Sequence, residues 1–281
     1  YVINFTAGCR MNLNGKNIIL TGAAGGIGQP LAFALSKRGA RLALVDRDQA
    51  RINGLCEKIN QLGGIAVPIV TDFQVNETAP NPTQMVVDTT MKLLGGVDIL
   101  INSAGVLDFT LLQEQDATRI AQMMHINAVV PLQLTRALLP KLLTQNGGQI
   151  VNIGSIFGSI GFPHYATYSA SKFAVHGFSQ ALRRELLDTD ITVTYVAPRA
   201  IKTPMNDEVA AKMLAATKTA MDEPHVVVAE IIKAIEADKQ EHYIGQPESF
   251  FAWLNGFLPS VVSMGLKKPT RIARKFITSK N

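Results

Sequence analysis

Short apolar runs of strand length alternate with longer helical segments along most of this chain of 281 residues. Runs that are apolar on both faces suit strands buried in a parallel sheet, and parallel neighbours must be joined by crossover helices. The alternation therefore predicts the α/β class: a single doubly wound domain with a mainly parallel, seven-stranded sheet. We expect strands near 17–21, 41–46, 65–71, 97–102, 149–154, 191–197 and 241–244. We expect helices near 26–38, 48–62, 82–94, 116–144, 165–188, 204–219 and 224–238.

The net charge of +5 is concentrated at the end of the chain. Residues 1–245 carry 21 Lys/Arg and 21 Asp/Glu, whereas residues 246–281 carry six Lys/Arg against Glu248 alone. A nucleic-acid groove needs clustered cations on its binding face, so we expect no nucleic-acid partner. Cys9 and Cys56 are too few for a disulfide framework, which favours a reducing compartment and a cytoplasmic location.

A glycine-rich turn follows the first predicted strand directly, in Thr21-Gly22-Ala23-Ala24-Gly25-Gly26-Ile27-Gly28. Between a strand and a helix, glycines let backbone amides approach a pyrophosphate, and the helix N-terminus adds partial positive charge. Gly22, Gly25 and Gly28 also fit a GxxGxxG spacing that is typical of a different branch of nucleotide-binding enzymes. The turn therefore predicts a Rossmann-like dinucleotide site, and its glycines alone leave the branch open.

An acidic residue, Asp46, ends the second predicted strand, where a carboxylate accepts hydrogen bonds from an adenosine ribose diol. The same carboxylate repels a 2′-phosphate, whereas a guanidinium on the neighbouring Arg47 can pair with one. The glycine turn itself contains no basic residue. The sequence thus favours NAD as the cofactor and keeps NADP as the alternative.

Tyr168 and Lys172 lie four residues apart on a predicted helix and therefore share one of its faces. An ammonium beside a phenol favours the phenolate, which lowers the tyrosine pKa and suits it to exchange a proton with an alcohol oxygen. Tyr165 has Ser169 at the same offset and no cation, so it is not the expected base. Ser155 ends a strand thirteen residues before Tyr168, where open α/β sheets gather their ligands. The combination predicts proton transfer at an alcohol or carbonyl group.

With these motifs in order, residues 14–245 resemble the short-chain dehydrogenase/reductase superfamily in its compact, non-extended form. The glycine turn resembles the family's TGxxxGxG motif, and residues 102–105 resemble its NNAG motif with Ser103 in place of the second asparagine. Residues 198–203 resemble its PGxxxT segment, from which Arg199 departs by replacing the glycine. A long cation at that position could reach the cofactor or the substrate. Asp72 falls where the family places an adenine-contacting aspartate.

The resemblance implies an NAD(P)-dependent oxidoreductase that interconverts a secondary alcohol and a ketone. In this mechanism Ser155 binds the substrate oxygen, Tyr168 exchanges the proton, and Lys172 lowers the tyrosine pKa and holds the nicotinamide ribose. The implied catalytic residues are Asn127, Ser155, Tyr168 and Lys172. The implied cofactor contacts are Thr21, Gly22, Gly26, Ile27, Gly28, Asp46, Arg47, Asp72, Asn102, Ala104, Gly105, Tyr168, Lys172, Pro198, Ile201 and Thr203.

The family places Asn127 at a helix kink, where its backbone carbonyl binds a water that leads to the lysine. Pro131 follows four residues later and has no N–H to give that carbonyl, so the sequence frees the acceptor that the relay needs. The alternative is that Pro131 ends one helix and Asn127 caps another.

The last part of the chain carries an uncharged run over residues 249–266, followed by cations. Its large apolar residues recur with helical spacing and present one broad face, interrupted by Pro259. Asn255, Gly256 and Pro259 argue against a membrane span. The face either packs over the substrate pocket or another subunit, which we favour, or anchors residues 249–281 at an anionic membrane surface. An apolar wall near the pocket suits a lipophilic alcohol or ketone.

These observations divide the chain into three parts. Residues 1–10 are expected to be a leftover of expression or a disordered N-terminus without a signal peptide, and Met11 the natural start. Residues 11–245 form the NAD(P)-binding domain, in which the resemblance implies a substrate lid over about 203–223. Residues 246–281 form an apolar and basic helical extension. The resemblance also implies a homodimer or homotetramer through the helices at 116–144 and 165–188.

Two other functions stay open at this stage. One is an NADPH-dependent reductase of acyl or sugar carbonyls, and the other is a nucleotide-binding regulatory protein that has lost turnover. The five histidines lack metal-ligand spacing with cysteines or carboxylates, so we expect no metal site. His164, just before the catalytic helix, is a candidate for contact with the substrate.

Overall fold

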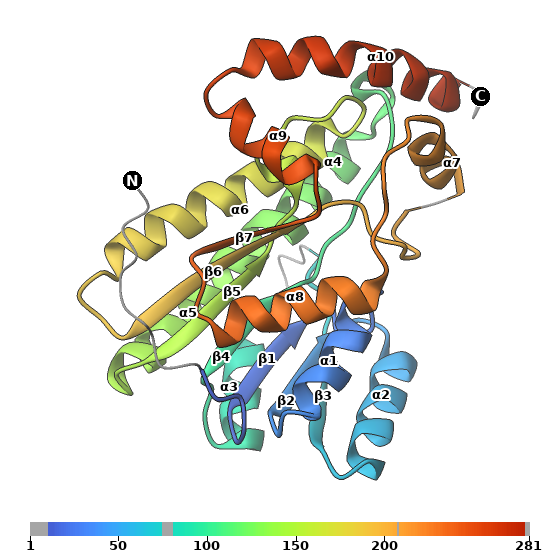
Figure 1. The fold of residues 1–281 in the computed structure, drawn as a ribbon. Coiled ribbons are helices and arrows are strands. Elements are labelled where there is room, and N and C mark those ends of the chain that lie inside the picture. Colours follow the sequence, from blue (N-terminus) through green and yellow to red (C-terminus); the bar gives the residue numbers. More distant parts are fainter. Residues whose placement is uncertain (1–10, 75–80, 207, 279–281) are drawn as a thin grey trace.

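Seven parallel strands form one sheet at the centre of the computed structural model, which describes residues 11–74, 81–206 and 208–278 (Figure 1). The strand order is β3-β2-β1-β4-β5-β6-β7. The order reverses direction between β1 and β4, and this reversal opens a crevice at the carboxyl ends of the strands. The strands are β1 (Asn17–Thr21), β2 (Arg41–Asp46), β3 (Ile65–Val70), β4 (Ile99–Asn102), β5 (Gly148–Ile153), β6 (Ile191–Pro198) and β7 (Glu241–Ile244).

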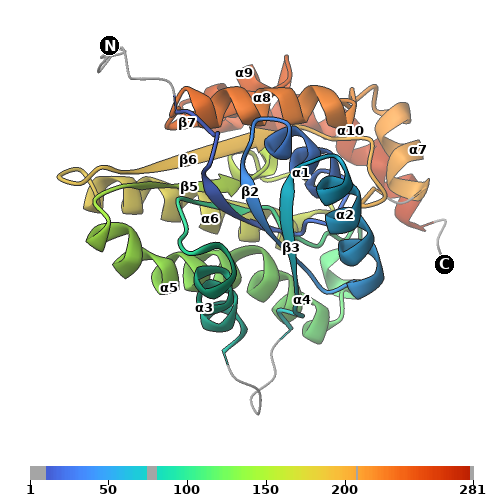
Figure 2. The ribbon, with the colours of Figure 1, turned by 90° about the horizontal axis from the view of Figure 1, so that it is seen from below.

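Helices cover both faces of the sheet, as a doubly wound fold requires (Figure 2). Ile18 and Leu20 of β1 pack under α1, α2 and α8, whereas Ile19 faces α3, α5 and α6. This alternation follows from the two-residue period of a strand. The helices are α1 (Gly28–Ser36), α2 (Gln49–Gln61), α3 (Pro82–Leu94), α4 (Ala117–Met124), α5 (Val130–Thr144), α6 (Ala166–Glu185), α7 (Glu208–Ala216), α8 (Pro224–Glu236), α9 (Glu248–Asn255) and α10 (Pro259–Thr278). The predicted α/β fold is confirmed.

The helix expected over 116–144 is divided into three pieces. Between α4 and α5 the chain makes a π-helical turn over His125–Val129, in which the N–H of Val130 donates to the carbonyl of His125. Pro131 lies in the first turn of α5 and cannot donate to the carbonyl four residues before it. The expected interruption is therefore present at Asn127, but the chain stays helical through Pro131, so the proline ends no helix.

The C-terminal extension forms two helices rather than one interrupted face. Pro259 begins α10, a position where its missing N–H costs nothing. The inner side of α10 packs against α7, with Ala273 and Ile277 in one cluster with Met213. No helix of the described residues is long and apolar enough to span a bilayer. The expectations for residues 1–10 and for the last three residues fall outside the described parts of the chain.

Candidate active site

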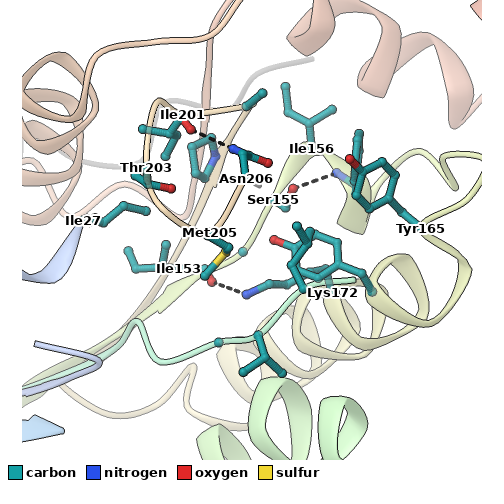
Figure 3. Close-up of a pocket in the computed structure, with 18 of the residues that line it drawn as sticks. Ile27, Ile153, Ser155, Ile156, Tyr165, Lys172, Ile201, Thr203, Met205 and Asn206 are labelled. Atoms are coloured by element: carbon teal, nitrogen blue, oxygen red, sulfur yellow. Dashed lines mark hydrogen bonds between the residues drawn. The ribbon is translucent and has the colours of Figure 1, made fainter. Parts of the chain in front are cut away.

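One cavity of about 660 Å³ runs along the carboxyl edge of the sheet. At one end it is lined by the glycine turn and Asp46, and further along by Ser155, Tyr168 and Lys172. Figure 3 shows the part of the cavity around Ser155 and Lys172. Its outer wall comes from α9 and α10. The fold thus brings the predicted nucleotide turn and the predicted catalytic side chains to one continuous space.

The glycine turn has the geometry that a phosphate group needs. Gly22 has a φ of +67°, and a Cβ there would lie 2.8 Å from the Cα of Ala104, so only glycine fits the close approach of these two loops. Helix α1 then begins at Gly28 with no side-chain cap and no acidic residue in its first turn. The N–H of Gln29 donates to the carbonyl of Gly25 at 3.1 Å, whereas Ile27 and Gly28, just before it, line the cavity. The turn therefore fits an anionic pyrophosphate.

Asp46 lies at the same end of the cavity, at the end of β2. Its carboxylate accepts hydrogen bonds from the N–H of Ala24 at 2.9 Å and from the N–H of Asp48 at 3.2 Å. These bonds fix the carboxylate against the glycine turn. Arg47 lines the cavity as predicted, and Arg51 lines it as well. Arg51 was not predicted, although it lies one helical turn beyond Arg47 in the sequence.

Thr21 and Asn102 were predicted to contact the cofactor but do not line the cavity. The Thr21 hydroxyl accepts hydrogen bonds from the N–H groups of Ser103 and Ala104, at 3.0 and 3.1 Å. The Asn102 amide donates to the side-chain oxygen of Asn152 at 2.8 Å. Both residues lie one layer behind the cavity wall, where they join the ends of neighbouring strands. The other predicted cofactor contacts line the cavity, namely Gly22, Gly26, Ile27, Gly28, Asp46, Arg47, Asp72, Ala104, Gly105, Tyr168, Lys172, Pro198, Ile201 and Thr203.

Asn127 is also buried behind the cavity rather than lining it. Its side-chain oxygen accepts from the N–H of Val106 at 2.8 Å, and its amide donates to the Val106 carbonyl at 2.8 Å and to the Ser171 hydroxyl at 3.0 Å. A Cβ on Gly105 would lie 3.3 Å from the Asn127 side-chain oxygen and 3.8 Å from the Lys172 ammonium. Asn127 therefore holds the loop after β4 beside the lysine, while the predicted role of its backbone carbonyl stays a prediction.

Ser155, Tyr168 and Lys172 meet between the end of β5 and the first turns of α6. The Ser155 hydroxyl accepts a hydrogen bond from the N–H of Phe157 at 3.1 Å. The Lys172 ammonium donates to the Ile153 carbonyl at 3.0 Å and lies 5.7 Å from the centre of the Tyr168 ring. Figure 3 draws these two hydrogen bonds as dashed lines and shows Ser155 and Lys172 among the residues that line the cavity.

Burial dominates the titration of the tyrosine–lysine pair. It raises the pKa of the Tyr168 phenol to about 12, and the hydrogen bond with Ser155 opposes this shift. It lowers the pKa of the Lys172 ammonium to about 8. The net shift of the Tyr168 pKa is therefore upward in the chain by itself, because burial penalises the phenolate, and the lowering by Lys172 stays a prediction.

Tyr195 is a residue of the site that the sequence did not reveal. It lies on β6, is fully buried, and its hydroxyl donates to the carbonyl of Ser155 at 3.1 Å and accepts from the N–H of Ser155 at 3.4 Å. Its ring stacks on His176 with centroids 4.5 Å apart. Gly154 has no room for a Cβ, because the Tyr195 ring lies there. The strand turn that presents Ser155 is thus formed around the phenol of Tyr195.

An aromatic and aliphatic wall encloses the far end of the cavity. Phe157 stacks on Phe162 with centroids 4.8 Å apart and meets the edge of the Tyr168 ring at 6.2 Å. Tyr165, rejected as the base, is buried in this wall. Further apolar lining comes from the two C-terminal helices, at Phe251, Leu254, Val261, Val262, Leu266 and Pro269.

Arg199, the departure from the family's glycine, is held in ion pairs. Its guanidinium donates to Asp222 at 2.7 and 3.0 Å, to Glu248 at 3.0 Å, and to the Gln246 carbonyl at 2.7 Å. These partners raise the pKa of Arg199 further. The side chain joins the end of β6 to the segments before α8 and at the start of α9. The loop beyond it is closed by Asn206, whose amide donates to the Ile201 carbonyl at 2.8 Å.

The histidines make packing and polar contacts. His176 lies 3.3 Å from Glu241, and His242 lies 3.0 Å from Glu230. His164 has a φ of +68° and does not line the cavity, and burial lowers its pKa. Within the ranges that the structure describes, no group of three His, Cys, Asp or Glu side chains is arranged to hold a metal ion.

Comparison with known proteins decides the family. The model of the short chain dehydrogenase family matches residues 16–214, which is more than half of the chain. The chain belongs to the short-chain dehydrogenase family. As a short-chain dehydrogenase it is an oxidoreductase that acts on CH–OH or carbonyl groups with a nicotinamide cofactor.

Some of the relatives that this short-chain dehydrogenase resembles are named as reductases. It is 31% identical over 237 residues to the ketoacyl reductase HetN of Nostoc sp., covering 83% of this chain and 80% of the relative. It is 32% identical over 203 residues to the 3-oxoacyl-[acyl-carrier-protein] reductase FabG of Vibrio cholerae, covering 70% of this chain and 80% of the relative. A short chain dehydrogenase/reductase of Burkholderia phymatum, solved in complex with NAD, is 21% identical and covers 89% of this chain and 96% of its own, with a TM-score of 0.80. That likeness shows the fold.

Proposed function

We propose that this short-chain dehydrogenase interconverts a lipophilic secondary alcohol and the corresponding ketone, with NAD as the favoured cofactor. The observation that carries the proposal is the single cavity that joins the uncapped N-terminus of α1 to the hydroxyl groups of Ser155 and Tyr168. A dinucleotide at the first end and a carbonyl at the second would lie in one space.

Residues at the two ends of the cavity would hold the cofactor. The N–H groups at the start of α1 suit the pyrophosphate, and the fixed carboxylate of Asp46 suits a ribose diol better than a 2′-phosphate. When bound, the nicotinamide supplies hydride exchange with the substrate carbon.

The chain's own residues would move the proton and hold the substrate oxygen. Because its pKa is raised to about 12, the Tyr168 phenol carries its proton at neutral pH and can give it to a ketone oxygen. The Ser155 hydroxyl would donate a hydrogen bond to the same oxygen. The Lys172 ammonium, 5.7 Å from the phenol ring, would stabilise the phenolate that remains. In the direction of alcohol oxidation Tyr168 must first lose its proton, so this direction is favoured by alkaline pH.

The cavity wall supports the lipophilic part of the proposal. The rings of Phe157 and Phe162 and the side chains that α9 and α10 contribute surround the space beyond Tyr168. The transfer of apolar groups from water into such a space is favourable, whereas sugar hydroxyls would lose their hydrogen bonds to water there.

A second candidate is the NADPH-dependent reduction of an acyl carbonyl. Two observations favour it: the relatives that are named for ketoacyl substrates, and the presence of both Arg47 and Arg51 at the Asp46 end of the cavity. Two guanidinium groups can pair with a 2′-phosphate.

Assembly as a homodimer or homotetramer is part of the proposal. Apolar side chains are exposed on the two long helices expected to mediate it, at Leu132 and Leu143 of α5 and Phe173 of α6. Sedimentation equilibrium measures the mass, and a monomer at micromolar concentration would contradict this assembly.

The test of function is a panel of ketones and secondary alcohols, graded in apolar size and including a β-ketoacyl thioester, followed by nicotinamide absorbance with NADH and NADPH. The proposal expects the largest kcat/KM with NADH and a bulky apolar ketone. A preference for the thioester with NADPH would favour the second candidate. Binding of either cofactor without turnover of any substrate would indicate a regulatory protein.

A matched pair of tyrosine variants tests the assignment of the proton donor. Tyr168→Phe should lower kcat by about 10²- to 10⁴-fold with cofactor affinity unchanged, because only the transferred proton is lost. Tyr165→Phe, three residues away in the same wall, should retain most of its activity. Comparable loss in both variants would contradict the assignment.

A further inference from the structure

Helix α9 turns into α10 at one edge of the molecule (Figure 1). Besides Phe251, six large apolar side chains of these two helices and their connection are exposed there. Trp253 is 61% exposed and Phe257 is 70% exposed, and their ring centroids lie 5.2 Å apart. Phe250 extends this aromatic row on the other side of Trp253, at 5.8 Å. Clusters of this kind mark surfaces that bind a partner. We call the six residues the elbow patch: Phe250, Trp253, Phe257, Leu258, Val261 and Met264.

Helix α10 continues the elbow patch with positive charge along one outward face. Its buried or half-buried positions recur every three or four residues and face α7 and the cavity: Val262, Leu266, Pro269, Ala273 and Ile277. The exposed positions with the same spacing are apolar near the elbow and basic beyond it: Val261, Met264, Lys268, Arg271 and Lys275. We call the last three, with their exposed neighbours Lys267 and Arg274, the basic stripe. A partner that lies along this face of α10 therefore contacts apolar side chains near the elbow and cations further along the helix.

The charges around this face select an anionic partner. Residues 249–278 contain no acidic residue, and the nearest one in the sequence, Glu248, is paired with Arg199 at 3.0 Å. A two-fold dimer that covers the whole of this face would bury the cations of the basic stripe without acidic partners, which is costly. A partner with an apolar interior and a negatively charged surface complements both the elbow patch and the basic stripe.

We propose that the elbow patch and the basic stripe dock this protein on the surface of an anionic phospholipid bilayer. The aromatic side chains lie at the level of the headgroups and acyl boundary, where indole and phenyl rings are favoured, and the cations of α10 face lipid phosphates. The helix lies along the surface and does not cross it.

The docking surface also adjoins the cavity. Phe251 and Val261 are 42% and 45% exposed and line the cavity as well, so the same two helices separate it from the proposed bilayer. A lipophilic substrate dissolved in the membrane would therefore enter between them. This route rests on the proposed function, whereas the docking surface does not.

Trp253 is the single tryptophan of the chain, so its fluorescence reports on the elbow patch alone. Vesicles of phosphatidylcholine with phosphatidylglycerol should shift its emission to the blue and sediment with the protein. Both effects should be lost in high salt and with pure phosphatidylcholine, since the cations hold the protein at the surface. Absence of both effects with anionic vesicles overturns the proposal.

Two sets of variants separate the apolar and the ionic contributions. Lys268→Glu with Arg271→Glu should weaken vesicle binding by more than about tenfold, and Phe257→Ser with Met264→Ser should remove the blue shift while leaving Trp253 in place. The matched controls are Lys58→Glu with Lys92→Glu, an equal change of charge on exposed sites of α2 and α3, and Leu187→Ser, an exposed leucine beyond α6. Equal losses in the controls would overturn the proposal.

A second copy of the chain is the competing occupant of the patch. It would give a blue shift that depends on protein concentration without vesicles, together with a doubled mass that Phe257→Ser abolishes, and this result would also overturn the proposal. Vesicle binding is measured without turnover, so its outcome is independent of the outcome of the substrate panel.

Discussion

Tyr195 acts on catalysis through the backbone of Ser155 rather than by touching substrate. Tyr195→Phe removes a hydroxyl that bonds to both backbone groups of Ser155 and leaves the ring stacked on His176. We expect kcat to fall roughly ten- to a hundredfold with KM nearly unchanged, because the serine hydroxyl is misplaced while the apolar wall remains. Steady-state kinetics on the preferred ketone measure this split.

Tyr243 provides the matched control for that prediction. Its hydroxyl lies 2.9 Å from the Ser159 hydroxyl, and its ring meets that of Tyr195, but it forms no hydrogen bond with Ser155 in the described structure. Tyr243→Phe should cost about 1 kcal/mol of stability, as a lost hydrogen bond does, and leave kcat near the wild-type value. A parallel fall of kcat in both variants would show that general loosening, not the position of Ser155, is responsible.

Lys172 is needed for the proposed catalysis, but its buried charge lowers the free energy of unfolding. Its folded pKa of about 8 lies below the ordinary 10.5, so at pH 7 the folded chain keeps a buried charge that the unfolded chain holds in water. This penalty is present below pH 8 and is removed as the pH rises through 8 towards 10.5. Lys172→Met should therefore raise the free energy of unfolding by about 1–3 kcal/mol at pH 7 while turnover is lost.

Urea unfolding at several pH values checks the sign. The advantage of Lys172→Met over the wild type should shrink between pH 8 and pH 10, because the wild-type lysine then loses its proton in the folded state. A constant advantage across this range would mean that packing, and not the buried charge, accounts for it.

The sequence predicted the side chains with local spacing and missed those with distant partners. Tyr168 and Lys172 are one helical turn apart, so their common face follows from the helix. Tyr195 lies forty residues after Ser155, and only the pairing of β6 with β5 brings them together. Thr21 and Asn102 matched motif positions, but whether a buried polar group faces the cavity or the neighbouring strand depends on tertiary hydrogen bonds that spacing does not contain.

The contact of α10 with α7 forms the cover over the catalytic tyrosine. Ala273 is fully buried in the cluster that also contains Met213, Leu214 and Tyr168. Ala273→Asp would bury an unpaired carboxylate, so α10 must separate from α7. We expect KM for a bulky apolar ketone to rise about tenfold, with cofactor affinity unchanged, since no residue of the glycine turn belongs to this cluster.

The control for this prediction lies on the same helix. Ser263→Asp places the same charge on an exposed position of α10 and should leave KM unchanged. If Ala273→Asp weakens NADH binding as strongly as substrate binding, the cover is not an independent element.

Element boundaries followed from the sequence where turn chemistry is strong. The helix expected at 82–94 matches Pro82–Leu94, because Asn81 accepts from the N–H of Thr83 at its start and Gly95 takes a φ of +83° at its end. The breaks within 116–144 and 249–266 were harder to predict from the sequence. A proline can end a helix, lie in its first turn or follow a π-helical turn, and the packing around it decides which of these occurs. Pro131 lies in the first turn of α5, and Pro259 begins α10.

At the scale of the whole molecule, a dinucleotide bound along the cavity would contact residues at both of its ends, so binding should stabilise the entire fold. A ligand at about one hundred times its Kd adds about 2.7 kcal/mol to the free energy of unfolding. NADH should therefore shift the urea midpoint more than NADPH at equal concentration, because the carboxylate of Asp46 repels a 2′-phosphate. The double variant Arg47→Ala with Arg51→Ala should keep the NADH shift and reduce the NADPH shift. If the wild type is stabilised more by NADPH, and the double variant reverses this order, the two guanidinium groups outweigh Asp46 and the cofactor is NADP.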